Sequence, residues 1–184
     1  MIFWSVIAFL GLLFGGWVIW NFSLDPMWQP TDHVTVTRIL QLSGLEEGEL
    51  LYDLGCGDGR IVAAAAKRRG ARAVGVEIDP VRFLVSKLRV FFGGVSSRAR
   101  IKLGNMYEED LSDADVVVLF LSAKANRKLS SKLREELGPG SRIVSYYHPL
   151  PDWEPRQVGR SADNYNLYLY CKPPEEQSNE PRLD

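Results

Sequence analysis

A glycine-rich turn between two regular elements is the feature that most constrains the fold of this 184-residue chain. The hydrophobic run LLYD ends at Asp53, the turn LGCGDG follows, and a helix-forming stretch begins at Arg60. Glycines let a backbone adopt positive φ and approach a ligand closely. The first turn of the helix presents backbone N–H groups that have no partner within the helix. Strand, turn and helix in this order predict a ligand-binding βα unit.

The acidic residues around the turn indicate the kind of ligand. A second strand ends at Glu77, 22 residues after Gly55. An acidic residue at about that distance hydrogen-bonds ribose hydroxyls in nucleotide-binding units. Dinucleotide sites use G-x-G-x-x-G around a pyrophosphate, whereas this chain has G-x-G-x-G with Asp53 two residues before it. A carboxylate there would repel a pyrophosphate but suits a cofactor with an amino group and a sulfonium cation, so an NAD-linked oxidoreductase is the least favoured interpretation.

Strand and helix patterns alternate along the rest of the chain. They predict an α/β fold class, a Rossmann-like and mostly parallel sheet with helices on both faces. The expected helices are 31–42, 60–69, 80–92 and 123–137, and the expected strands are 49–54, 73–76, 99–103, 116–121 and 142–146. Residues 147–165 are too few for a further crossover helix. Strands over 153–158 and 166–171 therefore predict a C-terminal antiparallel hairpin, in a sheet of six or seven strands.

The first 24 residues differ from the remainder of the chain. Residues 2–20 (IFWSVIAFLGLLFGGWVIW) carry no charge. As a helix they would span about 28 Å, close to the roughly 30 Å hydrocarbon core of a bilayer. A basic residue before the run and an A-x-A site after it, the marks of a cleaved signal peptide, are both missing, although such a peptide is the main alternative. The G-x-x-x-G from Gly11 to Gly15 is compatible with helix dimerisation.

These patterns divide the chain into four parts. We expect residues 1–24 to form a transmembrane anchor and residues 25–30 to form a Pro-bounded linker. Residues 31–172 would be the folded domain. Residues 173–184 lack apolar periodicity and are expected to be a disordered tail. The first basic residue is Arg38, so charge bias says little about membrane orientation.

Charge and cysteine content exclude several classes of protein. The chain has 22 basic and 23 acidic side chains, which argues against a strongly basic nucleic-acid-binding protein. Two cysteines and two histidines support neither a disulfide scaffold nor a zinc site, so no metal is expected. Residues 60–102 are locally basic, with eleven Lys and Arg against two acidic residues. Such a patch is either a solvated surface or, close to a bilayer, attracts membrane lipid; no specific nucleic-acid partner is expected.

Two motifs carry a resemblance to a known superfamily. The segments DLGCGDGR, starting at Asp53, and GVEIDP, containing Glu77, resemble motifs I and II of the class I S-adenosylmethionine-dependent methyltransferases. The resemblance covers about residues 31–171 and implies S-adenosyl-L-methionine as cofactor. It implies that the turn lines the methionine part, Glu77 holds the ribose, Ile78 packs on adenine and Asn105 hydrogen-bonds its amino edge. The implied cofactor-binding residues are Asp53, Gly55, Gly57, Gly59, Glu77, Ile78 and Asn105.

A narrower likeness adds the apolar N-terminus and the segments DLGCGDGRIVAAA and RIVSYYHPLPDW. These resemble the membrane-anchored protein-lysine methyltransferases that modify the adenine nucleotide translocase and the ATP-synthase c-subunit, with their prokaryotic relatives. The likeness implies an integral membrane protein as partner, with lysine as methyl acceptor. It also implies a single-pass membrane protein whose catalytic domain lies on the cytosolic or mitochondrial matrix side. Residues 122–124 (SAK) depart from the expected pattern, which leaves the target protein open.

Aromatic residues near the end of the fifth strand are candidates for the acceptor pocket. Tyr146, Tyr147 and His148 lie at the carboxyl edge of the sheet, and Trp28 would close the pocket from the linker. Methyl transfer from a sulfonium requires alignment more than acid–base help, so no catalytic residue is predicted. The Asn/Asp-Pro-Pro-Tyr/Phe motif of amide and base amino acceptors does not follow the fourth strand. A lipid or hydrophobic small-molecule methyltransferase and a non-catalytic S-adenosylmethionine-binding module stay open.

Overall fold

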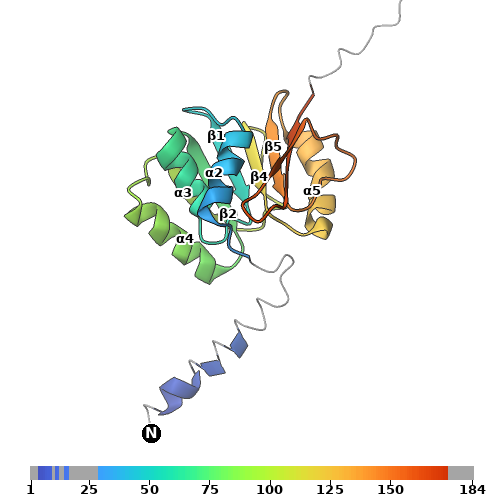
Figure 1. The fold of residues 1–184 in the computed structure, drawn as a ribbon. Coiled ribbons are helices and arrows are strands. Elements are labelled where there is room, and N and C mark those ends of the chain that lie inside the picture. The colour runs from blue at the N-terminus through green and yellow to red at the C-terminus, as the bar shows by residue number, and fades with distance from the viewer. Residues whose placement is uncertain (1–3, 10, 13–14, 17–28, 174–184) are drawn as a thin grey trace, which may run out of the picture.

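The computed structural model describes residues 4–9, 11–12, 15–16 and 29–173. Residues 29–173 form an α/β fold around a seven-stranded sheet with the order β3-β2-β1-β4-β5-β7-β6 (Figure 1). Strands β1 to β5 are parallel to their neighbours in that group, whereas β7 pairs antiparallel with both β5 and β6. The strands are Leu50–Leu54 (β1), Arg72–Glu77 (β2), Ala99–Leu103 (β3), Val116–Leu119 (β4), Arg142–Tyr146 (β5), Gln157–Arg160 (β6) and Asn166–Cys171 (β7).

Helices cover both faces of this sheet. On one face, α2, α3 and α4 pack against Leu51, Val118 and Val144. On the opposite face, α5 places Leu129 and Leu133 against the other side of the same strands. The helices are His33–Leu42 (α2), Arg60–Arg69 (α3), Pro80–Phe92 (α4) and Ala123–Glu136 (α5).

The central strands are buried along their whole length. Every residue of β1 and of β4 is buried, as expected for parallel strands between two helix layers. Successive side chains point to opposite faces, so Leu51 joins one core cluster while Tyr52 and Leu54 join the other. Asp53 is the polar exception, and it lies near the carboxyl end of β1.

The order of the strands reverses between β1 and β4. Leu54 of β1 lies opposite Val76 of β2 on one side and Leu119 of β4 on the other. The chain builds outward from β1 to β3 and then returns to place β4 beside β1. In open α/β sheets, ligands bind at the carboxyl ends of the strands at such a switch point. The topology therefore locates a ligand site between β1 and β4.

Side-chain caps set the starts of α2, α4 and α5, whereas the N-cap of α3 is Gly59, which has no side chain to offer. Oδ1 of Asp32 accepts hydrogen bonds from the backbone N–H groups of Val34 and Thr35 at 2.8 and 2.9 Å. Asp79 and Ser122 cap α4 and α5 in the same way. Each cap satisfies a backbone donor that the helix itself cannot pair. The residue directly before each of these three helices therefore determines where the helix begins.

The predicted elements agree with the structure in type and order, but the hairpin begins later than its pattern predicts. Instead of residues 153–158, β6 comprises Gln157–Arg160. Trp153 belongs to the core beneath: its indole N–H donates to Oγ of Ser130 at 3.1 Å, and its ring lies 6.2 Å from that of Tyr170. The apolar start of the predicted strand is therefore used for packing against α5, and pairing with β7 begins only afterwards.

Among the residues that the structure describes, no helix combines the length and the apolar character that a membrane span needs. Of the predicted anchor at residues 1–24, the structure describes helical pieces at 4–9, 11–12 and 15–16. The rest of that segment, the linker up to residue 28 and the tail from residue 174 lie outside the described residues. The anchor and the disordered tail stay predictions.

Candidate cofactor and acceptor site

A cavity of about 550 Å³ opens at the carboxyl ends of the parallel strands. Its walls come from the loops that follow β1 to β5 and from the segment that leads into α2. The cavity therefore lies at the switch point that the topology defines. The predicted site residues on its walls are Asp53, Gly55, Gly57, Glu77, Ile78, Asn105, Tyr147 and His148.

The glycine-rich turn needs glycine for two different reasons. Gly55, Gly57 and Gly59 have φ values of 79°, 57° and 74°, which L side chains rarely adopt. Gly55 borders the cavity, and a Cβ there would lie 3.1 Å from Cδ2 of Leu121. Gly59 does not border the cavity: a Cβ there would lie 2.8 Å from the Cβ of Ser86. The structure thus gives Gly59 a packing role between α3 and α4 rather than the cofactor contact that the resemblance implies.

Asp53 is a buried carboxylate that the described residues leave partly unsatisfied. It is 3% exposed, and its Oδ2 has no hydrogen-bond partner among them. Burial, with the nearby charges of Glu77 and Asp58, raises the pKa of Asp53 to about 8. A cation in the cavity would favour the ionised carboxylate. This position therefore fits the ammonium or sulfonium group of a ligand.

Glu77 ties the end of β2 to the glycine-rich turn. Its Oε2 accepts the backbone N–H of Gly57 at 2.8 Å, and its Oε1 accepts that of Asp79 at 2.9 Å. Burial raises the pKa of Glu77, although these two N–H donors act in the opposite direction. Each carboxylate oxygen retains a second lone pair, which a ribose hydroxyl can use. Glu77 is thus held in place by the same turn that it helps to shape.

The predicted adenine side is formed by Ile78 and Asn105. Ile78 is 44% exposed and gives the cavity an apolar wall beside Glu77. The Asn105 amide is engaged within its own loop: Nδ2 donates to Oε1 of Glu108 at 2.7 Å, and Oδ1 accepts the backbone N–H of Tyr107 at 3.1 Å. These bonds position Asn105 on the wall and leave one amide hydrogen for a ligand.

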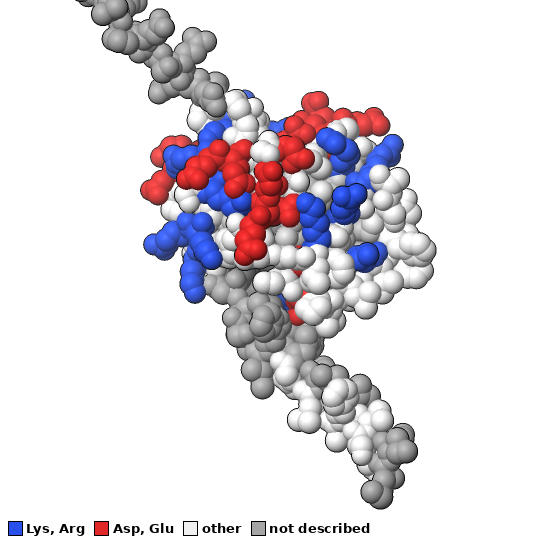
Figure 2. Space-filling model, turned by 180° about the vertical axis from the view of Figure 1, so that it is seen from behind, with Lys and Arg blue, Asp and Glu red and all other residues white. Residues whose placement is uncertain are grey.

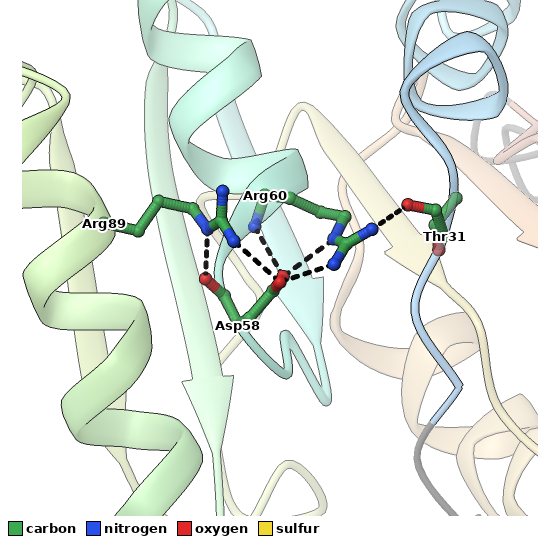
Figure 3. Close-up of polar contacts among 4 residues, drawn as sticks. All are labelled: Thr31, Asp58, Arg60 and Arg89. Carbon is green, nitrogen blue, oxygen red and sulfur yellow. Dashed lines mark hydrogen bonds and ion pairs between the residues drawn. The ribbon is translucent and has the colours of Figure 1, made fainter.

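An ion-pair network that sequence reasoning missed holds the turn in place, and its members Asp58 and Arg60 border the cavity (Figure 3). The Asp58 carboxylate pairs with Arg60 at 2.5 Å and with Arg89 at 2.8 Å, and Arg60 also donates to the carbonyl of Thr31. Burial raises the pKa of Asp58, but the two arginines outweigh it and lower that pKa. The network joins the turn, α3, α4 and the chain entering α2. Only the short spacing between Asp58 and Arg60 hinted at it in the sequence.

Tyr147 and His148 form an aromatic group on the cavity wall. Tyr147 has a φ of 73°, an arrangement that costs a non-glycine residue roughly 1–3 kcal/mol. Its ring lies edge-on to those of His148 and Tyr165, at centroid distances of 4.6 and 4.8 Å. Such strain persists only where the surrounding structure fixes it, and it clusters at functional sites. The backbone geometry therefore marks Tyr147 more strongly than its sequence position does.

Tyr146 does not border the cavity. It is 5% exposed, and its ring packs on that of Phe120 at 4.3 Å, while Phe120 itself borders the cavity. Tyr146 is the last residue of β5 and supports the wall from behind, whereas Tyr147 follows the strand with a left-handed backbone and borders the cavity itself. Trp28 lies outside the described residues. Sequence reasoning missed Phe120, although its place just after β4 at the carboxyl edge could have indicated it.

Lys128 and Tyr107 form a second wall group that the sequence pattern did not reveal. The Lys128 ammonium lies 3.8 Å from the centre of the Tyr107 ring, a cation–π contact. The two residues come from α5 and from the loop after β3, and both border the cavity. No sequence spacing relates them, because only the packing of α5 on the sheet brings them together.

The walls of the cavity fit S-adenosylmethionine. The unpaired oxygen of Asp53 suits its cationic groups, Glu77 suits its ribose, and Gly55 leaves room that a side chain would fill. The fold resembles a Salinibacter ruber RNA methyltransferase in complex with S-adenosyl-L-homocysteine, with a TM-score of 0.77, 37% identity and coverage of 83% of this chain and 98% of that one. Fold and site define a class I methyltransferase, and S-adenosylmethionine is its cofactor.

Relatives narrow this class to one family. Residues 53–157 match the ANTKMT methyltransferase domain. The chain is 41% identical over 145 residues to a protein-lysine N-methyltransferase of Saccharolobus islandicus, covering 77% of this chain and 90% of that protein. It is 32% identical over 140 residues to the Homo sapiens lysine N-methyltransferase of the ATP-synthase c-subunit, covering 76% of this chain but 59% of that protein. The chain belongs to the ANTKMT methyltransferase family.

A third relative shows the same partial overlap. The Mus musculus adenine nucleotide translocase lysine N-methyltransferase is 34% identical over 134 residues, which cover 72% of this chain and 58% of that protein. The chain thus spans most of the Saccharolobus relative and little more than half of either mammalian one.

Proposed function

We propose that this chain is a membrane-tethered methyltransferase that acts on lysine side chains of an integral membrane protein. The observation that carries the proposal is a single cavity whose walls hold both the cofactor-binding residues Asp53 and Glu77 and the aromatic residues Tyr147 and His148. The three relatives named above are lysine N-methyltransferases, which supports lysine as acceptor. Two of them are named for the ATP-synthase c-subunit and for the adenine nucleotide translocase.

The chain's own residues would bind and align the reactants. S-Adenosylmethionine, when bound, supplies a methyl group on a sulfonium sulfur. Asp53 would pair with a cationic group of the cofactor, and Glu77 would accept its hydroxyl hydrogens. A lysine amine has an ordinary pKa of about 10.4 and must lose a proton before it can attack. Enclosure beside Tyr147 and Phe120 disfavours the charged amine, and alignment of its nitrogen with the methyl group supplies most of the remaining rate enhancement.

The tether is proposed from the uncharged residues 2–20. The chain joins the folded domain at Gln29, which already borders the cavity. The nine residues that follow Trp20, up to Gln29, can reach at most about 32 Å. An anchor would therefore keep the cavity close to the bilayer, with the domain on the cytosolic or mitochondrial matrix side.

Label transfer tests the acceptor. Full-length protein is incubated with methyl-tritiated S-adenosylmethionine and membranes of its source organism, and protein, lipid and nucleic acid are then separated. We expect base-stable label on lysine in a membrane-protein band, and background label with Asp53→Ala. Label in lipid would replace the proposal with lipid methylation. Label in nucleic acid would favour the RNA activity for which the Salinibacter ruber relative is named.

Two further measurements test turnover and the tether. If calorimetry shows cofactor binding but no fraction takes up label, the domain is a non-catalytic binding module. Deletion of residues 1–24 should leave cofactor affinity unchanged and reduce transfer to membrane substrates, because the anchor raises the local concentration of acceptor. Equal transfer by the truncated protein would reject the tether as a contributor to activity.

A further inference from the structure

The outer face of α4 exposes a continuous row of large apolar side chains. We call these residues the apolar stripe of α4: Val81, Leu84, Val85, Leu88, Phe91 and Phe92. At about 100° per residue they fall within an arc of about 120°, so they form one band along the helix. Leu84, Phe91 and Phe92 are 57%, 67% and 80% exposed, whereas the buried residues of α4 are Ser86 and Val90. The most apolar side of this helix therefore faces away from the sheet.

Basic side chains border the apolar stripe. Arg82 lies beyond one margin of the arc and Lys87 beyond the other, as their positions on the helix require. Residues 80–98 contain four basic residues and no acidic residue. Seen from behind, charged side chains of both signs gather over the upper part of the domain, while the edge on the α4 side is largely uncharged (Figure 2). An apolar face bordered by Lys and Arg is typical of helices that lie in a bilayer interface.

The apolar stripe begins at the edge of the cavity. Ile78 and Arg82, just before and within the first turn of α4, border the cavity. Gln29 and Pro30, which follow the N-terminal segment, border it too. The 13 residues of α4 extend about 20 Å from this edge. A membrane anchor that ends before Gln29 would thus bring the bilayer to the same edge of the domain from which the stripe extends.

We propose that the apolar stripe of α4 docks on the membrane surface, with Arg82 and Lys87 against anionic lipid head groups. This inference deepens the tethering proposed above and rests on it, because the anchor supplies proximity while the stripe fixes the orientation of the domain. With α4 in the interface, the mouth of the cavity lies at the level of the head groups. The substrate class follows: a lysine at the membrane–water boundary of an integral membrane protein.

Charge favours a bilayer over a second copy of the chain as the occupant of this surface. Two copies that met stripe to stripe would bring the basic residues on both margins, Arg82 and Lys87, close to one another. Like charges in such an interface are unfavourable, whereas anionic head groups pair with them and add attraction for each basic residue.

Photolabelling from the lipid tests the docking. Full-length protein is reconstituted in phosphatidylcholine–phosphatidylglycerol vesicles that contain a phospholipid with a diazirine on its acyl chain, and adducts are mapped by mass spectrometry. We expect adducts on residues 80–92 and none on α5. The double variant Leu84→Gln, Leu88→Gln should lower the label on residues 80–92 severalfold. It should leave cofactor affinity unchanged, because neither residue borders the cavity. The matched control is Arg127→Gln on the exposed face of α5, which should change nothing.

Each outcome separates the docking from the anchor and from the reaction. Label in residues 1–24 without label in residues 80–92 would overturn the docking and leave the tether standing. Label in residues 80–92 alone would uphold the docking and reject the anchor. Cross-links between two copies through α4, in place of lipid adducts, would assign the stripe to a dimer. Equal yield in vesicles of phosphatidylcholine alone would contradict the role of Arg82 and Lys87. None of these readouts depends on methyl transfer.

Discussion

Helices α4 and α5 cover opposite faces of the same sheet, yet their outer surfaces have opposite characters. On α5, Leu129 and Leu133 are fully buried against the sheet, while Arg127 is exposed. On α4, the sheet side carries Ser86, Val90 and the partly buried Phe83, while the residues of the apolar stripe point outward. An amphipathic pattern therefore predicts a helix and its two sides, but it does not say which side faces the core. On α4 the apolar stripe faces away from the sheet, on the side for which the membrane surface is proposed above.

The largest effect expected from this contrast is on stability. Leu129→Ala on α5 should lower the free energy of unfolding by about 2–5 kcal/mol, because Leu129 is fully buried and its removal leaves a cavity. Leu88→Ala on α4, where the side chain is 45% exposed, should change it by no more than about 0.5 kcal/mol. Urea denaturation of both variants measures the difference. An equal loss in Leu88→Ala would mean that another part of this chain covers the apolar stripe.

An intermediate effect is expected where α4 meets α3. Gly59→Ala combines a left-handed backbone with a Cβ that lies 2.8 Å from the Cβ of Ser86, so it should separate the two helices. Gly94→Ala has a similar φ of 68° but open space around its Cβ, and it serves as the control. The overpacked variant should be less stable than its control by roughly 1–3 kcal/mol. Equal melting temperatures would show that α4 is loosely held on the sheet.

The smallest effect concerns Asp53, at the cavity that both helix layers frame. In the ligand-free protein the pKa of Asp53 is about 8, so most of its carboxyl groups are protonated at pH 7. Asp53 must release this proton when a cation binds beside it. Cofactor affinity should therefore rise with pH, by at most about tenfold per unit below pH 8, where one unit equals about 1.4 kcal/mol. Calorimetry at pH 7 in buffers of different ionisation enthalpy should detect proton release from the native protein and none from Asp53→Asn. Equal release from both would exclude Asp53 as the source.

The raised pKa of Asp53 also predicts how the stability of the ligand-free protein changes with pH. The folded state prefers neutral Asp53, whereas the unfolded chain ionises it near its ordinary value of about 3.9. Stability should therefore fall as pH rises from about 4 to about 8, because the unfolded state releases the proton first. Denaturation of Asp53→Asn over the same range should lack this component.

Much of the fold could be predicted because its signals are local. The caps at Asp32 and Asp79 and the buried run of β1 are each contained in a few neighbouring residues. The hairpin start was predicted wrongly because the use of Trp153 depends on Ser130 and Tyr170, which are distant in sequence. A residue with apolar character fits a strand and a core position equally well.

The residues of the candidate site also fall into those that the sequence could predict and those that it could not distinguish. The sequence led to Asp53 and Glu77 because each ends a strand at a fixed distance from the glycine-rich turn. It did not separate Tyr146, which packs behind the wall, from Tyr147, which faces the cavity. Tyr146 ends β5, whereas Tyr147 lies just beyond it at a φ of 73°, and no pattern in the sequence distinguishes these two backbone conformations.

By itself, the sequence determined the βα unit, the cofactor class and the presence of a helix over residues 80–92, since each follows from residue types at fixed spacings. Only the tertiary structure decided the packing role of Gly59, the ion pairs between Asp58 and Arg89, and the outward direction of the apolar stripe. These features depend on how whole elements approach one another. Gly59, just before α3, approaches Ser86 closely on the buried side of α4, and no local pattern within α4 contains that information.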